Sequence, residues 1–213
     1  MKNTILLLFI LFCHFNGSAQ KYVFNTLVKY STKMNNENDE KVTYTNTQND
    51  SYFLRLKKSE SSLSAILYDY KNLKMHEFRV IETKSKNEFF FKFEYLKSTK
   101  LNLEVKNKFI DYHFTFQNIS SNDSIRKVKL NCYESSKKKK SLMEYELEIK
   151  NYSQNLFPSF RVSCIHPFEF IERLNIHENG LVINAKGTVL SGKKASFKLL
   201  ELKQVDFELE VKN

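Results

Sequence analysis

Residues 88–117 read EFFFKFEYLKSTKLNLEVKNKFIDYHFTFQ, and this stretch decides the fold class. Apolar side chains take alternate positions in three successive runs, which are Phe89, Phe91, Phe93 and Tyr95, then Leu101, Leu103 and Val105, then Ile110, Tyr112, Phe114 and Phe116. Side chains two residues apart on a strand point to the same side of a sheet, so each run predicts a strand with one apolar face. Because the connections are too short for crossover helices, the stretch predicts an antiparallel meander.

The same two-residue period recurs along most of the chain. It is clearest in residues 21–34, 125–134, 142–150 and 205–212, and residues 160–170 are also expected to be extended. Apart from the N-terminal segment, no long stretch has a helical period. We therefore predict an all-β fold built on an antiparallel meander. About a dozen strands in one sheet must curl or close, so a strongly curved sheet or half-barrel, a closed barrel and a sandwich of two sheets remain open alternatives.

The N-terminal segment has the three parts of a secretory signal. Lys2 gives a short basic start, residues 4–12 are apolar, and Gly17 and Ala19 are small. The apolar run is too short to span a bilayer comfortably. We expect residues 1–19 to be a signal peptide, so that the protein is secreted into the periplasm or beyond the bacterial envelope.

The remaining residues, 20–213, have the length of one β-rich domain with a sizeable core. The polar residues 118–124 form the clearest loop of the chain and are the candidate internal boundary.

Two cysteines, Cys132 and Cys164, remain once the signal is removed. Each falls in an alternating run, which places its thiol on the apolar face of an expected strand. In an oxidising compartment an even pair predicts a disulfide, which for a loop of this length would contribute about 3–4 kcal/mol. Two buried free thiols are the alternative.

The formal net charge of +10 favours anionic partners such as lipid head groups, acidic glycans or cell-wall polymers. The strongest cluster is formed by Lys137, Lys138, Lys139 and Lys140. These lysines are expected either to contact phosphate groups or to form a solvated hairpin tip. Nucleic-acid binding is not expected, because it requires exposed aromatic residues among the basic ones, and the aromatic residues here lie on apolar strand faces.

Catalytic and metal motifs are weak. Asp111 and His113 lie two apart on the polar face of an expected strand and could form a carboxylate–imidazole pair, but no nucleophile accompanies them. The histidines and cysteines have no metal-ligand spacing. We therefore predict a non-enzymatic protein with no metal and no cofactor, and keep a hydrolase with a site assembled from distant residues as a less favoured alternative.

The aromatic rows carry the functional hypothesis. The chain has 19 Phe and 11 Tyr but no Trp, and such rows on neighbouring strands either fill a core or line an apolar cavity. Since no covering helix is predicted, we expect an apolar or amphipathic, lipid-like ligand, or an envelope protein partner, on the concave sheet face. The expected contact residues are Phe89, Phe91, Phe93, Tyr95, Tyr112, Phe114 and Phe116.

Two other architectures imply other functions. A packed β-sandwich would act as a structural or interaction module through its basic face. An outer-membrane barrel is disfavoured, because several runs are too short for tilted membrane strands, and we expect the protein not to span a membrane.

Two short segments carry a family resemblance. The signal end Gly17-Ser-Ala-Gln20 and the stretch YTNTQNDSY at residues 44–52 resemble those of uncharacterised exported β-rich proteins of Bacteroidota. The succession of strands is also similar to the half-barrels of lipoprotein-carrier-like proteins, although those have helices in the concavity and none is predicted here. The resemblance implies a location in the envelope.

Overall fold

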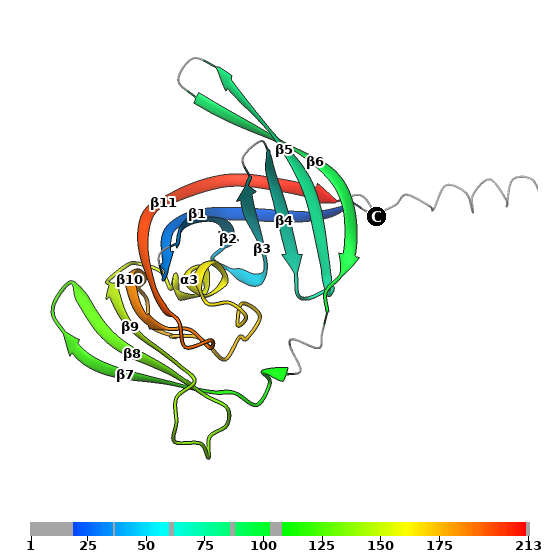
Figure 1. The fold of residues 1–213 in the computed structure, drawn as a ribbon. Helices are drawn as coiled ribbons and strands as arrows, with labels where there is room; N and C mark the ends of the chain where they lie inside the picture. Colours follow the sequence, from blue (N-terminus) through cyan, green and yellow to red (C-terminus); the bar gives the residue numbers. More distant parts are fainter. Residues whose placement is uncertain (1–18, 36, 60–61, 86–87, 103–107, 212–213) are drawn as a thin grey trace, which may run out of the picture.

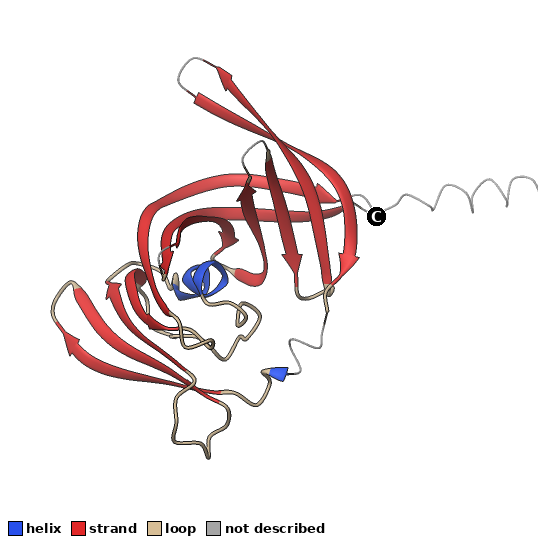
Figure 2. Ribbon diagram, viewed as in Figure 1, coloured by secondary structure: helices blue, strands red, loops and turns tan. Residues whose placement is uncertain are grey.

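The computed structural model describes residues 19–35, 37–59, 62–85, 88–102 and 108–211, and the all-β prediction is confirmed (Figures 1 and 2). In the described part of the chain, eleven strands form one antiparallel sheet in the order β6-β5-β4-β3-β2-β1-β11-β10-β9-β8-β7. The strands are β1 (Gln20–Met34), β2 (Glu37–Asn46), β3 (Asn49–Lys58), β4 (Leu63–Asp69), β5 (Lys74–Ser85), β6 (Glu88–Lys100), β7 (His113–Ser121), β8 (Ile125–Tyr133), β9 (Met143–Lys150), β10 (Leu181–Thr188) and β11 (Lys194–Val211). The predicted signal peptide falls almost entirely outside the described residues.

The centre of the sheet is the pair β1–β11, which joins the two ends of the described chain. Its register runs from Gln20↔Val211 to Met34↔Ala195. Neighbouring strands are also neighbours in the sequence from β1 to β6 on one side and from β11 to β7 on the other, and the long connection between β9 and β10 contains helix α3 (Phe157–Cys164). The middle of the sequence therefore supplies both edges of the sheet.

This order corrects the predicted meander. β6 and β7, which come from residues 88–117, do not pair with each other and lie at opposite edges. Leu101 directly follows β6, whereas Leu103 and Val105 lie outside the described residues. The two-residue period predicted the apolar face of each strand correctly, but it contains no information about which strand is the neighbour.

The sheet is strongly curved and open, as expected for a half-barrel, and a helix lies inside its concavity (Figure 1). Helix α3 (Phe157–Cys164) replaces the strand predicted for residues 160–170. The side chains from Ser159 to Cys164 are all buried, so the segment lacks the polar face that gives a helix its period. Pro158 lies in the first turn, where proline is compatible with a helix.

Helix α3 also explains why the two cysteines do not lie on facing strands. Cys132 lies on β8, but Cys164 ends the helix and is not on a strand. Both are buried free thiols, so the predicted disulfide is absent and the alternative interpretation is correct. Burial raises the pKa of the Cys132 thiol to about 12 and raises that of Cys164 well above its ordinary value, which keeps both unreactive.

Two hydrophobic clusters fill the two halves of the sheet. The helix core packs around α3 and includes Val28, Tyr30, Leu130, Tyr145, Phe160, Phe168 and Phe197. The strand core is built by β1, β2, β3, β4, β5 and β11 and includes Tyr22, Phe24, Leu54, Leu67, Phe78 and Leu209. The buried row of β1 changes from the strand core to the helix core where the β1–β11 register shifts, between Phe24 and Thr26.

The strand core is closed by the sheet itself. Phe207 of β11 stacks on Phe24 with ring centroids 5.5 Å apart. Phe93 of the edge strand β6 lies 5.0 Å from Phe207. The sheet therefore curls until its edge contacts its centre, and the strand core is covered without a helix.

Two further features of the fold bear on the sequence analysis. Residues 118–124 end β7 and form the turn into β8. Of the helices in the described ranges, none has the length and apolar character needed to cross a membrane.

Candidate functional site

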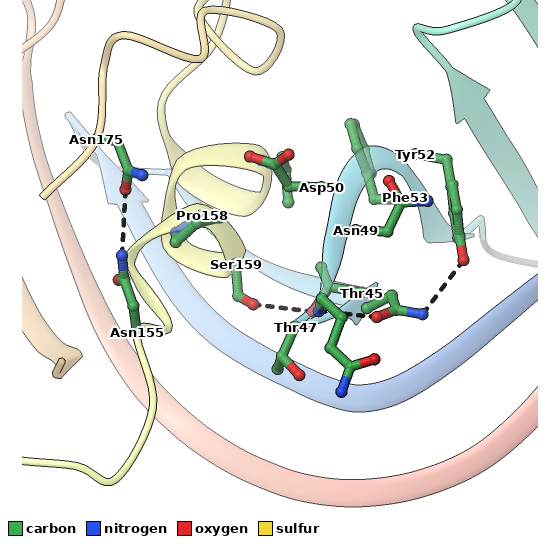
Figure 3. A pocket seen from close by; sticks show the side chains of 13 residues that line it. Thr45, Thr47, Asn49, Asp50, Tyr52, Phe53, Asn155, Pro158, Ser159 and Asn175 are labelled. Carbon is green, nitrogen blue, oxygen red and sulfur yellow. Dashed lines mark hydrogen bonds between the residues drawn. The ribbon is translucent and has the colours of Figure 1, made fainter. Parts of the chain in front are cut away.

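A hollow of about 220 Å³ lies between the β2–β3 turn and helix α3 (Figure 3). Its lining combines amides, hydroxyls and a carboxylate with a small apolar surface. The lining residues are Thr45, Asn46, Thr47, Gln48, Asn49, Asp50, Tyr52, Phe53, Asn155, Pro158, Ser159, Val162 and Asn175.

The β2–β3 turn that forms one wall is held by its own side chains. Asn46 Oδ1 accepts a hydrogen bond from the Gln48 backbone N–H at 2.9 Å, the local bonding typical of asparagine in turns. Asn25 of β1 holds Thr47 twice, through the Thr47 hydroxyl at 2.9 Å and the Thr47 N–H at 3.0 Å. This wall is therefore ordered before any ligand binds.

The opposite wall comes from α3 and from Asn155, which lies two residues before the helix. The Ser159 hydroxyl bonds to the Thr45 hydroxyl at 2.8 Å, which joins the helix to β2 (Figure 3). The Asn155 amide donates to the Ile176 carbonyl at 2.6 Å, and its oxygen accepts from the Phe157 N–H at 3.0 Å. These contacts tie the helix start to both the sheet and the segment that follows the helix.

Arg161 links the two walls. Its side chain is 1% exposed, and one terminal nitrogen lies 2.8 Å from Asp50 Oδ2. The other terminal nitrogen donates to the carbonyls of Ile171 and Leu174 at 3.3 and 3.2 Å. Asp50 is itself 41% exposed, and among the described contacts its Oδ1 has no hydrogen-bond partner. A buried cation thus orients a carboxylate that lines the hollow and retains one free acceptor.

A second charged group lies beside the hollow. Glu169 is buried and bonds His166 Nδ1 at 2.8 Å, which raises the pKa of the His166 imidazole. Arg55 lies 3.5 Å from Glu169 and stacks over the Phe53 ring at 5.3 Å. Because Phe53 lines the hollow, this ion pair supports the apolar part of its wall.

The predicted aromatic residues on β6 do not line the hollow. Phe91 and Tyr95 are 39% and 40% exposed, and Phe93 is partly buried against Phe207. The side chain of Phe89 lies outside the described part of the structure.

The predicted aromatic residues on β7 form a separate row at the opposite edge. Tyr112 and Phe114 contact the Phe168 ring at 5.9 and 5.2 Å, and Phe116 contacts Phe157 at 5.7 Å. The structure therefore brings the β7 row against α3 and the segment after it, and does not bring the two rows together.

The other candidate residues are exposed. Lys137, Lys138, Lys139 and Lys140 lie in the β8–β9 connection, where Lys138 is 3.8 Å from Glu134. Asp111 lies in the turn before β7 and His113 begins that strand. The described residues contain no group of three or more His, Cys, Asp or Glu side chains arranged to hold a metal ion.

A buried polar network in the strand core was not predicted. The Tyr22 hydroxyl donates to Asp69 Oδ2 at 2.6 Å and lies 3.2 Å from His76 Nε2. His76 Nδ1 lies 2.6 Å from the Ser98 hydroxyl. Since the single Tyr22 proton is used on Asp69, His76 donates from Nε2 and accepts from Ser98 at Nδ1.

The pKa values in this network follow from burial and hydrogen bonding. Burial lowers the pKa of His76 and keeps its ring neutral. Burial also works against ionisation of Asp69, but the hydrogen bonds from Tyr22, Asn72 and Gln20 outweigh it, so the pKa of this carboxyl is below its ordinary value. Within this network Tyr22, Asp69 and His76 each have a hydrogen-bond partner, so we interpret the network as a structural one.

The hollow could not be located from the sequence, because its walls are more than a hundred residues apart. The Thr45–Ser159 and Asp50–Arg161 contacts span 114 and 111 positions. One local signal is present, namely Arg161 within the otherwise apolar segment around α3, where a charged residue needs a partner.

Comparisons with known proteins do not identify a family. No protein-family model matches the chain, and no curated protein matches its sequence. A crystal structure of a DUF1329 family protein from Desulfovibrio piger ATCC 29098 is similar over 88% of this chain and 86% of that chain, with 6% identity and a TM-score of 0.27. That likeness is too low to support an argument about fold or function. The resemblance to exported Bacteroidota and lipoprotein-carrier-like proteins stays a prediction.

Proposed function

We propose that the protein is exported to the bacterial envelope and acts there as a non-enzymatic binding protein. Its ligand is a small amphipathic molecule with several hydroxyl groups, of the chemical class of a sugar ring. The observation that carries the proposal is the Asp50 carboxylate, which is oriented by the buried Arg161 and lines a hollow together with the exposed Gln48 amide.

The donors and acceptors of the hollow match this class of ligand. A hydroxyl group both donates and accepts, so it can donate to Asp50 Oδ1 and accept from an amide such as that of Gln48. Pro158, which is partly exposed at the helix start, supplies an apolar surface for the C–H face of a ring, with the buried Val162 and Phe53 behind the wall. The ordered walls reduce the entropy lost on binding.

The size of the hollow argues against a lipid chain at this position. Ligand pockets are usually about 300–1,000 Å³, whereas this hollow is about 220 Å³. The concave face that was expected to hold a lipid-like ligand is occupied by α3 and the segment after it (Figure 1). We therefore keep an amphipathic ligand as the proposal, and assign its binding position to the hollow at the β2–β3 turn.

The test is binding of a panel of mono- and disaccharides to the chain purified from the exported fraction, followed by calorimetry and amide NMR shifts. Asp50→Asn keeps an oxygen for Arg161 but removes the charge, and Gln48→Ala removes one amide. Each is expected to weaken binding about tenfold, the loss of one good hydrogen bond to a charged or amide group.

Asp39→Asn is the matched control, because it removes an exposed carboxylate near the other end of β2, about 20 Å along the strand from the turn, and is expected to leave affinity unchanged. Failure of every saccharide to bind at millimolar concentration would overturn the proposal. Binding that ignores both hollow variants would overturn the assignment of the site.

A further inference from the structure

The edge strand β6 leaves an unusual amount of apolar surface uncovered. In the described sheet β6 pairs with β5 alone. Phe90, Phe91, Tyr95 and Leu96 are 54%, 39%, 40% and 51% exposed. An unpaired edge presents a row of free backbone donors and acceptors, which makes a long apolar edge a template for another strand.

The other edge differs. β7 is shorter, and its aromatic row packs against Phe157 and Phe168 of the helix core. β5 and β6 also continue beyond their neighbour, since β4 stops at the Leu63↔Val80 pair while β5–β6 pairing extends to Ser85↔Glu88. The result is a hairpin that projects from the sheet (Figure 1).

The sequence of β6 is complementary to itself when it is reversed about Phe93. An antiparallel copy in this register sets Lys92 opposite Glu94 and Glu94 opposite Lys92. It also sets Phe91 opposite Tyr95 and Phe93 opposite Phe93 at the axis, each on the face that packs against Phe207 in its own copy. Opposite charges and aromatic pairs directly across two strands are the stabilising combinations in a sheet.

Neighbouring registers lose this match. Moving the centre by one residue toward the N-terminus sets Lys92 against Lys92, and moving it by one residue toward the C-terminus sets Glu94 against Glu94. Like charges directly opposite each other are destabilising. The charges of β6 therefore select one register.

The geometry of β6 is compatible with this centre. Glu77 pairs with Lys97 and Phe78 with Tyr95, so Leu96 is an extra residue in β6. Such a bulge interrupts regular pairing, so the regular segment of β6 is residues 88–95, which contains Phe93 and both charged residues. Lys92 and Glu94 are 73% and 35% exposed and pair with each other along the strand at 3.0 Å, so in the dimer each exchanges this partner for the opposite charge of the second copy.

We infer that β6 pairs antiparallel with β6 of a second copy of the chain, with the two-fold axis at Phe93. The contact is isologous, so it closes after two copies and joins their sheets into one. Each projecting hairpin lies along the partner's sheet, and the exposed Phe90 and Leu96 are covered where the strands overlap. This inference is independent of the proposed ligand.

The experiment is a concentration series by sedimentation velocity on the full exported chain at about 0.15 M salt, where charge repulsion between the basic copies is screened. Lys92→Glu and Glu94→Lys each place like charges across the axis twice, and each is expected to weaken dimerisation about tenfold. The double variant restores opposite charges and is expected to dimerise like the original chain. Lys97→Gln, which removes a charge on the same strand away from Lys92 and Glu94 and loses only an exposed ion pair with Glu77, is expected to have no effect on dimerisation.

A chain that stays monomeric through the series would overturn the inference. So would a dimer that tolerates both single variants, or one that the double variant fails to restore. Thermal melting of each variant at low concentration verifies that the monomer is folded.

Discussion

The helix core and the strand core lie on the same sheet, and the long pair β1–β11 contributes to both. Val28 and Phe197 belong to the helix core, whereas Phe24 and Leu209 belong to the strand core. In the helix core a segment of the chain fills the concavity. In the strand core the sheet curls until β6 reaches β11.

The two cores also treat buried polar groups differently. Arg161 in the helix core bonds to carbonyls of an irregular segment, so a long side chain satisfies backbone that has no strand partner. In the strand core Tyr22, Asp69 and His76 come from strands and bond to one another. The comparison shows that the apolar face of one sheet can be covered either by an inserted segment of the chain or by the curvature of the sheet alone.

The largest expected difference between the cores follows from removing an aromatic ring. Phe160→Ala in α3 empties a site that is 0% exposed and is surrounded by Tyr30 and Phe197, so we expect a loss of about 3–5 kcal/mol of unfolding free energy. Phe207→Ala removes a partly buried ring of the strand core, and we expect about 1–2 kcal/mol. Urea unfolding measures both.

Ile119→Ala on β7 is the control, since its side chain is 52% exposed and its removal should change stability by less than about 0.5 kcal/mol. Equal losses at Phe160 and Phe207 would show that the two cores are filled equally tightly.

A smaller loss is expected from the polar contact of the helix core. Arg161→Leu leaves the Ile171 and Leu174 carbonyls without this donor and removes the ion pair to Asp50. We expect the unfolding free energy to fall by about 2–3 kcal/mol. Arg79→Leu is the matched control. Arg79 is 66% exposed and its ion pair with Glu94 is long, at 3.9 Å, so its removal should change stability very little. A neutral Arg161→Leu, judged by thermal melting, would mean that the segment after α3 is held by its apolar contacts alone.

In the strand core the polar contact is expected to be weaker. Tyr22→Phe deprives both Asp69 and His76 of a partner, and we expect a loss of about 1–2 kcal/mol. Ser98→Ala removes a partner from the outer side of His76, where water can replace it, so the loss should be below about 1 kcal/mol. Guanidinium unfolding of the two variants and their combination tests the order, and a larger effect at Ser98 would contradict it.

Much of the fold could be predicted because its signal is local. Alternation gives the apolar face of each strand from neighbouring residues alone, and Tyr145, Leu147 and Ile149 are buried as their period indicates. The partner of each strand depends on residues far away in the sequence, and for that reason β6 and β7 could not be placed at opposite edges.

The helix and the site depended on the same missing information. Phe160, Val162 and Cys164 alternate as in a strand, but the residues between them are buried too, so periodicity could not separate the two structures. With α3 mistaken for a strand, Cys164 was placed on a sheet face and the concavity was expected to hold a ligand or a partner protein. The hollow beside Asp50 exists only because α3 fills that space.

The smallest expected effects are those of pH, and they have opposite signs in the two regions. Burial lowers the pKa of His76 below its ordinary 6.5, so the unfolded chain takes up a proton more readily and stability falls as pH drops below about 6.5. The bond to Glu169 raises the pKa of His166, so its contribution is complete below 6.5 and is lost as pH rises through the raised value. The His166 side chain is 81% exposed, and screening by water should make its effect the weaker one.

Unfolding free energies between pH 5 and 8 for His76→Asn and His166→Asn separate the two terms. We expect His76→Asn to flatten the acid side of the profile and His166→Asn to flatten the neutral side slightly. Protonation of the buried His76 destabilises the folded protein, whereas protonation of His166 stabilises it through Glu169. A loss of stability in acid that persists in His76→Asn would therefore show that another group is responsible.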